Sequence, residues 1–304
     1  ERTQKTWYMV DRPHEKILLA AGNEYSFKRY TNAEGMPDKE WTQKKDSNEI
    51  RIITLGDSFT EGDGAAFDSC YPKVLEGMLQ KQFPQQKINV MNAGHCGSDP
   101  WFEYKKLHGL LLKYKPDIVV YTNGSNDLLF DHLIYGGMER FVKDNTVINK
   151  MPHHSWLGLF EVSYVFRAIM SAAGYDNTLF GYADREKNKE TAIIDSHELS
   201  RDYSQLAVAN NFKCIQIIRP EKDEMQHGEY DFNLAALLAT TDSLPQYSTF
   251  NLLQYYKDSL HISGDKAYDY FWKIDGHHNA KGYAAMAKGV YACLEPLVAE
   301  KIKN

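Results

Sequence analysis

The sequence is poor in cysteine and has no cysteine pair of the kind that binds zinc or exchanges disulfides. Its 304 residues include four cysteines, which are widely separated and form no Cys-x-x-Cys motif, and this argues against a zinc or redox site. We expect structural free thiols, with a single disulfide as the alternative if the protein is exported. The four residues are Cys70, Cys96, Cys214 and Cys293.

The sequence also lacks basic runs and long apolar stretches. The net charge is −6 and no run of lysine and arginine is long enough to form a basic patch, so we expect no nucleic-acid partner. No segment approaches the roughly 18 consecutive apolar residues that a membrane helix needs, so we expect no membrane span. The sequence has no His-Glu-x-x-His motif and no glycine-rich phosphate loop, so these two signatures of metal and nucleotide binding are absent from it. It carries no signal for the oligomeric state.

What the sequence does contain is an alternation of apolar segments of strand length with helical patterns. With 43% hydrophobic residues, the chain has enough apolar side chains for a substantial core. Apolar strands without polar alternation are typical of a parallel sheet that is buried on both faces. The expected strands are residues 50–55, 88–91, 117–121, 212–218 and 249–254.

Helical patterns lie between these strands. Residues 72–83 and 100–114 read as helices, and Asp99 is the expected N-cap of the second, with Pro100 in the first helical position. A last helix is expected from about Asn279 to the end of the chain. Its buried side should carry Ala284, Ala287, Val290 and Leu294.

Two regions fall outside this alternation. Residues 1–47 are polar and aromatic without sustained periodicity, and we interpret them as an extension that packs on or precedes a domain of residues 48–304. We interpret residues 131–205 as an insertion that covers the carboxyl edge of the sheet. Within it, the charged run 184–190 predicts a solvated helix face. The pair His153-His154 predicts a surface turn rather than a metal site, because no third ligand stands at a suitable spacing.

Four short polar motifs follow the predicted strands. Gly56-Asp57-Ser58 comes directly after the first strand and presents a serine at its carboxyl end, where α/β proteins carry their chemistry. Serine becomes a nucleophile when a base removes its proton and a third group orients that base. Asp275 with His277 or His278 supplies such a pair within one loop. The other two motifs are residues 92–97 and 121–127.

The two middle motifs supply hydrogen-bond donors. The tetrahedral intermediate of acyl transfer needs preorganised donors for its oxyanion. The backbone N–H groups of Ser58 and Gly97 and the side-chain amide of Asn126 would supply three donors from three strand ends. We interpret Asp127 as a brace for the turn after the third strand.

Together these motifs resemble those of the SGNH (GDSL-type) hydrolase superfamily. Residues 56–58 match its nucleophile block, 92–97 its glycine block, 124–127 its G-x-N-D block and 275–279 its Asp/His block. The resemblance covers residues 50–130 and 206–300. It implies a flavodoxin-like, doubly wound parallel α/β sheet, ester substrates, and neither metal nor cofactor.

The last motif leaves the base open between two adjacent histidines. The usual family spacing, Asp-x-x-His, selects His278, whereas the frame His-x-Asn-x-x-Gly-aromatic fits residues 277–283 and selects His277, which is our first choice. We expect the other histidine to face outward or to line the pocket rim.

The Asp-x-His spacing followed by asparagine resembles a bacterial branch of the superfamily that modifies envelope polysaccharides, and so does the segment 30–38. This resemblance implies an envelope or secreted location rather than a cytoplasmic one. Because the sequence begins with Glu1 rather than methionine, we expect a hydrophobic segment before it in the full-length gene product.

The sequence therefore predicts a serine esterase with Ser58 as nucleophile, His277 as base and Asp275 as the residue that orients it. By resemblance, and from the 13% aromatic content, the expected substrate is a short acyl ester, such as acetyl, on a carbohydrate. The alternatives are an O-acyltransferase with the same triad, a lysophospholipase-type lipid esterase, and a non-catalytic carbohydrate-binding protein on the same scaffold.

Overall fold

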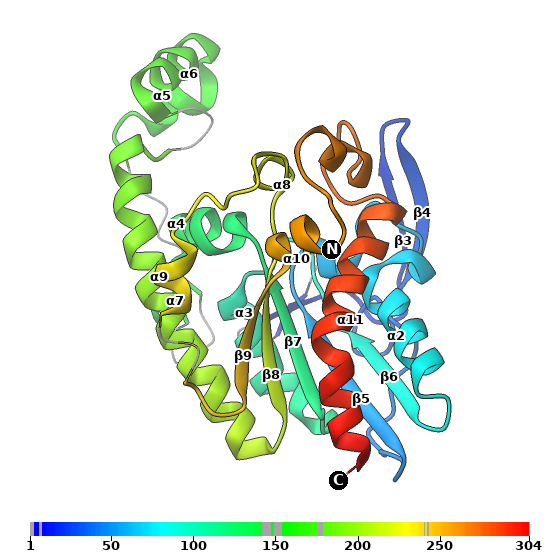
Figure 1. Ribbon diagram of the computed structural model, residues 1–304. Helices are drawn as coiled ribbons and strands as arrows, with labels where there is room; N and C mark the ends of the chain where they lie inside the picture. Colours follow the sequence, from blue (N-terminus) through cyan, green and yellow to red (C-terminus); the bar gives the residue numbers. More distant parts are fainter. Residues whose placement is uncertain are drawn as a thin grey trace.

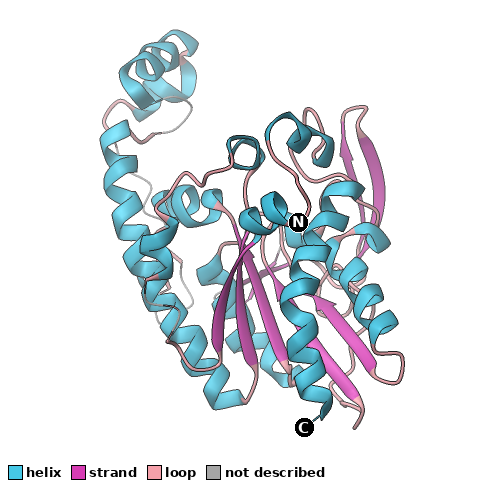
Figure 2. Cartoon of the chain, viewed as in Figure 1, coloured by secondary structure: helices cyan, strands magenta, loops and turns pink. Residues whose placement is uncertain are grey.

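The computed structural model of the chain is built on a five-stranded parallel sheet between two layers of helices (Figures 1 and 2). It describes residues 3–5, 8–141, 147–148, 154–175, 179–239, 241 and 243–303. The strand order is β6-β5-β7-β8-β9, and every neighbouring pair runs parallel. This is the order of the flavodoxin-like doubly wound fold, and the predicted fold class is confirmed.

The described elements have the following bounds. The strands are β1 Thr3–Lys5, β2 Tyr8–Val10, β3 Lys16–Ala21, β4 Tyr25–Tyr30, β5 Glu49–Leu55, β6 Lys87–Asn92, β7 Ile118–Asn123, β8 Lys213–Ile218 and β9 Tyr247–Asn251. The α-helices are α1 Ser58–Glu61, α2 Tyr71–Gln82, α3 Pro100–Lys106, α4 His132–Tyr135, α5 Leu157–Val162, α6 Tyr164–Met170, α7 Tyr182–Asn210, α8 Lys222–His227, α9 Leu234–Leu238, α10 Leu252–Asp258 and α11 Ala280–Lys303. Short turns of other helix types are η1 Phe67–Ser69, η2 Leu107–Leu111, η3 Leu112–Tyr114, η4 Asn126–Asp131, η5 Met138–Arg140, η6 Ser171–Tyr175 and η7 Gly264–Tyr270.

Successive strand residues point into two separate cores. In β5, Ile52 packs into the core beneath α2, α10 and α11, whereas Ile53 packs into the core beneath α3 and the second half of α7. The neighbouring strands alternate in the same way, because side chains alternate across a strand. Since both faces are covered, β5 and β7 are buried along their whole length, as the apolar runs in the sequence indicated.

The strand order creates a crevice at one edge of the sheet. From β5 the chain crosses to β6 on one side, and from β6 it returns to β7 on the other side of β5. At such a switch point the two connections diverge and leave a depression outside the carboxyl ends of the strands. The segments that follow β5 and β7 carry Ser58 and Asn126, so these two motifs enter the same crevice.

Most predicted elements agree with the structure, and a few do not. Asp99 caps α3 as expected and accepts hydrogen bonds from the N–H groups of Trp101 and Phe102. The predicted strand 249–254 is wrong at its end, because Asn251 instead caps the helix α10. Ala284 is only half-buried, whereas the three other predicted positions of α11 are buried. The described cysteines are all free thiols.

The N-terminal residues form two antiparallel hairpins, β1–β2 and β3–β4. The β3–β4 hairpin stands beside the domain, near the start of α11 (Figure 1). Residues farther along the extension bind the sheet directly: Asp38 accepts a hydrogen bond from the backbone N–H of Asn92 at 2.8 Å. The polar residues of this segment are thus used in contacts with the domain.

The range 131–205 contains two different structures. Helices α5 and α6 project beyond the carboxyl edge and away from the sheet (Figure 1). The second half of α7 instead packs against the sheet through Leu199, Tyr203 and Ala207, so it is the crossover helix between β7 and β8. The charged run 184–190 lies in the first half of α7, where side chains are exposed or half-buried. Within the described ranges, no helix is both long enough and apolar enough to cross a membrane.

Candidate active site

Ser58 lies on a tight turn between β5 and α1. Asp57 caps the short helix and accepts a hydrogen bond from the N–H of Phe59, so Ser58 is the first helical residue. The backbone at Gly56 has a φ of +151°, and a Cβ there would lie 2.1 Å from Oγ1 of Thr60 and 2.3 Å from Oγ1 of Thr122. Only glycine fits between these two side chains. This close packing fixes the path of the backbone from the end of β5 to Ser58.

Ser58, His277 and Asp275 form a continuous hydrogen-bonded chain. Nε2 of His277 lies 2.8 Å from Oγ of Ser58, and Nδ1 of the same ring lies 2.5 Å from Oδ1 of Asp275. The N–H of His277 also donates to Oδ1 of Asp275 at 3.3 Å. A nucleophile, a base and an orienting carboxylate stand in this order in serine hydrolases. The structure therefore brings Ser58, from the first quarter of the sequence, into contact with Asp275 and His277 from the C-terminal part, as the sequence predicted.

His278 lies in a different environment. Its side chain is buried, with 1% exposed, between the rings of Phe59, Phe271 and Tyr283. Nδ1 lies 3.1 Å from the backbone oxygen of Tyr270. Burial, together with the positive charge of Arg219, lowers the pKa of His278 to about 3. The expectation that the second histidine faces outward or lines the pocket rim is wrong, because aromatic residues of three segments enclose it.

The three expected oxyanion donors lie shortly after the carboxyl ends of β5, β6 and β7. Ser58 begins α1, and in the described structure its N–H has no hydrogen-bond partner. Gly97 is exposed in a turn with a φ of +72°, and the exposed Asn126 begins η4. Neither the N–H of Gly97 nor the amide of Asn126 has a partner among the described residues. All three groups are therefore free to donate to a ligand.

Glu61 holds the turn that carries Gly97. Its carboxylate accepts a short hydrogen bond from the N–H of Cys96, the residue before Gly97. The same carboxylate pairs with Nη1 of Arg29 at 2.6 Å, and both side chains are 4% exposed. Because Arg29 belongs to β4, the N-terminal hairpin is connected through a buried ion pair to this turn.

Arg219 is a site residue that the sequence analysis missed. It follows β8, and its buried guanidinium contacts three carboxylates: Asp57 at 2.6 Å, Glu221 at 2.9 Å and Asp127 at 3.4 Å. The guanidinium also lies over the ring of Phe59, at 3.9 Å from the centroid. A charged residue directly after the apolar run 212–218 was the available signal, since that position lies at the functional edge of the sheet.

The contacts of Asp127 agree with the predicted brace. Its Oδ2 accepts a hydrogen bond from the N–H of Gly124 at 2.7 Å, which closes the turn before Asn126. Burial and the neighbouring charge of Asp57 raise the pKa of Asp127, although Arg219 opposes this shift. Arg219 therefore joins the serine motif to the asparagine motif through two carboxylates.

For the histidine pair 153–154, the sequence predicted a surface turn rather than a metal site. His153 lies outside the described residues. Nε2 of His154 lies 3.0 Å from the backbone oxygen of Leu179, and its ring stacks on Trp156 at 4.4 Å. In the described part of the chain, no group of three histidine, cysteine, aspartate or glutamate residues is arranged to hold a metal ion.

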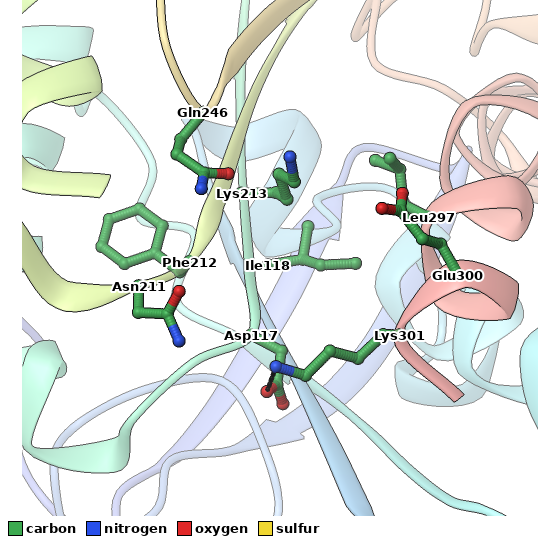
Figure 3. Close-up of a pocket in the computed structure, with 9 residues that line it drawn as sticks. All are labelled: Asp117, Ile118, Asn211, Phe212, Lys213, Gln246, Leu297, Glu300 and Lys301. Carbon is green, nitrogen blue, oxygen red and sulfur yellow. Dashed lines mark ion pairs between the residues drawn. The ribbon is translucent and has the colours of Figure 1, made fainter. Parts of the chain in front are cut away.

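A cavity of about 260 Å³ lies at the opposite edge of the sheet (Figure 3). Asp117 and Lys213, at the amino ends of β7 and β8, line it together with Lys301 of α11. Lys301 pairs with Asp117 at 3.3 Å. None of the residues of the triad lines this cavity, and parallel sheets carry their chemistry at the other edge.

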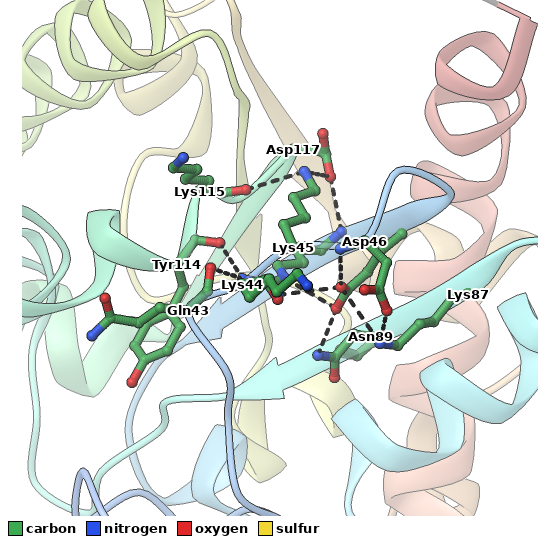
Figure 4. A network of polar contacts seen from close by, with 12 residues as sticks. Gln43, Lys44, Lys45, Asp46, Lys87, Asn89, Tyr114, Lys115 and Asp117 are labelled. Atoms are coloured by element: carbon green, nitrogen blue, oxygen red, sulfur yellow. Dashed lines mark hydrogen bonds and ion pairs between the residues drawn. The ribbon is translucent and has the colours of Figure 1, made fainter.

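The same edge contains a polar network in which Lys45 pairs with Asp117 (Figure 4). Arg51 of β5 is the buried centre of this network. The guanidinium of Arg51 donates to Glu49 at 3.0 Å and to the backbone oxygens of Tyr114 at 2.8 Å and Lys44 at 2.6 Å. The N–H of Arg51 donates to Asp117 at 2.9 Å. These partners satisfy the hydrogen-bonding groups of an arginine that has no exposed surface, so the network belongs to the packed amino edge and is not an open site.

Residues 54–285 match the GDSL-like Lipase/Acylhydrolase family. The chain belongs to this family. This GDSL-like protein is thus a carboxylic ester hydrolase, and the recognition made from the four motifs is confirmed. Comparison with curated proteins gave no match.

Several solved structures are similar to this GDSL-like esterase. A lipase from a goat rumen metagenome has 14% identity and a TM-score of 0.45 over 80% of this chain and 96% of its own. A variant of an acetyl xylan esterase from Geobacillus stearothermophilus has 12% identity and a TM-score of 0.49 over 80% and 93%. A two-domain esterase active on acetylated mannans has 15% identity and a TM-score of 0.47 over 82% and 49%. The substrates in these descriptions are those of the other proteins.

Proposed function

We propose that this GDSL-like esterase cleaves short acyl esters by a covalent serine mechanism in which Ser58 is the nucleophile. The observation that carries the proposal is the chain of two hydrogen bonds, 2.8 Å and 2.5 Å long, from Ser58 through His277 to Asp275. In this arrangement the imidazole can take the serine proton, and the carboxylate stabilises the imidazolium that forms.

The reaction proceeds in two halves. Oγ of Ser58 attacks the acyl carbonyl while Nε2 of His277 accepts the hydroxyl proton, and the same proton then passes to the departing alkoxide as the ester bond breaks. In the second half, His277 takes a proton from water, and the resulting hydroxide attacks the acyl-enzyme. Return of that proton to Oγ of Ser58 releases the carboxylic acid and restores the free serine.

Both tetrahedral intermediates carry a negative charge on the former carbonyl oxygen. We assign its stabilisation to the N–H groups of Ser58 and Gly97 and to the side-chain amide of Asn126. The support is that all three donors are unpaired within the described residues. Donors that are already oriented lower the barrier because they need no reorganisation during the reaction.

For the alcohol side, we propose a carbohydrate that carries a short acyl group such as acetyl. The Asp-x-His spacing of the last motif resembles that of polysaccharide-modifying members of the superfamily. In addition, Tyr25, Phe27 and Trp272 form a half-buried aromatic group near the Asp275 loop. Aromatic rings beside an ester site offer apolar faces to the C–H surfaces of sugars.

A panel of substrates tests this proposal. We expect the protein to hydrolyse chromogenic acetyl and propionyl esters faster than octanoyl and longer esters, and to release acetate from acetylated oligosaccharides. Ser58→Ala is the control for each substrate. A preference for long chains would contradict the short-acyl proposal, and transfer of acetyl to added sugar at a rate above hydrolysis would identify a transferase instead.

A further inference from the structure

The N-terminal hairpin lies against the loop that carries Asp275. Figure 1 shows β3 and β4 beside the segment that precedes α11. The hairpin belongs to the extension that precedes the sheet, and it lies outside the residues that match the family. Its contacts with the Asp275 loop are nonetheless specific and polar.

Glu24, in the turn of this hairpin, binds the backbone of the Asp275 loop with both carboxylate oxygens. Oε1 accepts from the N–H of Ile274 and Oε2 from the N–H of Asp275, each at 2.8 Å. Partial desolvation opposes ionisation of Glu24, but hydrogen bonds from the backbone of this loop outweigh it and lower its pKa. A charged acceptor makes a stronger hydrogen bond than a neutral one.

Tyr25, the next residue, contacts the same loop with its side chain. Its ring lies 5.4 Å from the ring of Trp272, and Trp272 is itself fixed by a hydrogen bond from Nε1 to the backbone oxygen of Gly64 at 2.7 Å. Burial raises the pKa of Tyr25, and so does the neighbouring charge of Asp275. Two consecutive hairpin residues therefore contact the Asp275 loop, Glu24 through its backbone and Tyr25 through the ring of Trp272.

At its base the loop is also held by Lys222, whose Nζ donates to the backbone oxygens of Trp272 at 3.1 Å and Lys273 at 3.2 Å, but its outer residues are open to solvent. Ile274 is 85% exposed, Lys273 is exposed, and Gly276 has a φ of +86° with open space around its Cα. A loop of this kind keeps one conformation only if its polar groups find fixed partners. The position of Asp275 decides the orientation of the His277 ring, and small misplacements of a catalytic group are costly.

We propose that Glu24 and Tyr25 are positioning residues that hold Asp275 in the geometry required by His277. The inference rests on the triad proposed above and extends it to a hairpin outside the central domain. Glu24 acts on the backbone of the loop, and Tyr25 packs against Trp272 within it. Neither residue touches the reacting atoms.

Three single variants and one control test this inference. Glu24→Gln keeps the size of the side chain but replaces one acceptor oxygen by an NH₂ group, whereas Glu24→Ala removes both acceptors. Tyr25→Phe removes only the hydroxyl and keeps the ring against Trp272. The matched control is Asn23→Ala, because Asn23 is exposed in the same turn and has no hydrogen bond to residues 271–278 in the described structure.

We expect the Glu24 variants to lower kcat with KM nearly unchanged. Glu24→Ala should lower kcat by roughly 10- to 100-fold, given that misplacement by about 1 Å can cost about 10². Glu24→Gln should fall between this variant and the control, and Tyr25→Phe should stay close to the control because it keeps the ring against Trp272. The rate at which a fluorophosphonate labels Ser58 should fall in the same order, because labelling also needs an oriented base.

The effect should disappear when the base is absent. In a His277→Ala background, Glu24→Ala should cause no further loss of the residual hydrolysis of an activated ester, since residues that act as a unit are not additive. A purely structural role would lower the melting temperature and would act in both backgrounds.

Two outcomes would overturn the inference. The first is an unchanged kcat in Glu24→Ala with a raised KM, because Glu24 would then support substrate binding and not the position of Asp275. The second is an equal loss in both backgrounds. Failure of the triad itself is a separate result, because it would appear as full turnover in Ser58→Ala whatever the hairpin variants do.

Discussion

Nη2 of Arg219 lies 2.6 Å from the carboxylate of Asp57, the residue immediately before Ser58. The same guanidinium contacts Asp127 beside the oxyanion motif and Glu221 beside its own strand. One buried cation therefore holds the ends of β5, β7 and β8 at a common point. The relative positions of Ser58 and Asn126 depend on it.

Removal of this cation should destabilise the fold. Arg219→Met leaves carboxylates buried without their partner, and we expect the free energy of unfolding to fall by about 3–5 kcal/mol. Arg219→Lys should restore only part of the loss, because an ammonium group cannot contact several carboxylates in fixed directions. Urea unfolding measures the free energy of unfolding of both variants. Arg201→Met is the control, because Arg201 is exposed. A loss below about 1 kcal/mol in the methionine variant would contradict a structural role for the ion pairs.

Ser58→Ala should abolish ester turnover and leave the protein folded. The reason is that Ser58 forms the covalent intermediate, whereas its side chain contributes little to the core. Turnover of an acetyl ester and circular dichroism measure the two properties. A fluorophosphonate probe should label the wild-type protein at Ser58 alone, as determined by mass spectrometry of its peptides. Wild-type turnover in the variant would disprove the assignment.

Asn126→Ala should lower kcat by roughly 10²–10³ with little change in KM, because the lost donor acts mainly on charge that develops in the transition state. Steady-state kinetics with a short acyl ester measure this effect, and Asn23→Ala again serves as the control. If Asn126→Ala weakened substrate binding without lowering kcat, an oxyanion role would be untenable.

Substitutions of the two adjacent histidines should have different effects on turnover. His277→Ala should lower kcat by several orders of magnitude, as expected for a lost triad base. His278→Phe should keep most of the turnover, because the His278 side chain has no hydrogen bond to Ser58 in the described structure. Its ring packs instead against Phe59, Phe271 and Tyr283. Steady-state kinetics of the two variants on the same ester show which histidine is the base. The opposite pattern would transfer the role of base to His278.

His278 should also make the fold sensitive to acid. Its pKa falls from 6.5 to about 3 in the folded state because it is buried. As the pH drops below 6.5, the unfolded chain binds a proton that the folded chain does not bind. The stability present above pH 6.5 is therefore lost progressively toward pH 3, by about 2 kcal/mol between pH 7 and pH 5.

Urea unfolding at several pH values checks this prediction, and His278→Phe is the matched variant without a titrating group. We expect the stability of the variant to change less between pH 7 and pH 5 than that of the wild-type protein, by about the amount that His278 contributes. Identical pH dependence in both proteins would mean that His278 titrates normally in the folded state.

Sequence patterns sufficed for the parts of the molecule that local rules determine. The buried strands appear as apolar runs, and the cap of α3 follows from Asp99 and Pro100. The frame His-x-Asn-x-x-Gly-aromatic of residues 277–283 favoured His277, the histidine that the structure sets beside Ser58. The site follows from the sheet, because motifs after β5 and β7 must converge at a switch point.

The remaining features depend on contacts between distant segments. Arg219 and Asp57 are 162 residues apart, and Glu24 and Asp275 are 251 residues apart. No periodicity or spacing relates such pairs. The burial of His278 likewise follows from aromatic residues of three separate segments. The polar extension 1–47 has no strong pattern, since its strands are short and few of its residues, such as Val10 and Met36, enter the core.

The contact between Glu24 and the Asp275 loop has a consequence for exchanging parts between related esterases. A fragment that starts at β5 would keep every strand of the central sheet and all the residues of the triad. It would nevertheless leave the backbone N–H groups of Ile274 and Asp275 without the carboxylate that receives them. The interchangeable unit in this protein is therefore discontinuous, and a chimaera that moves the loop 271–278 should move the hairpin with it.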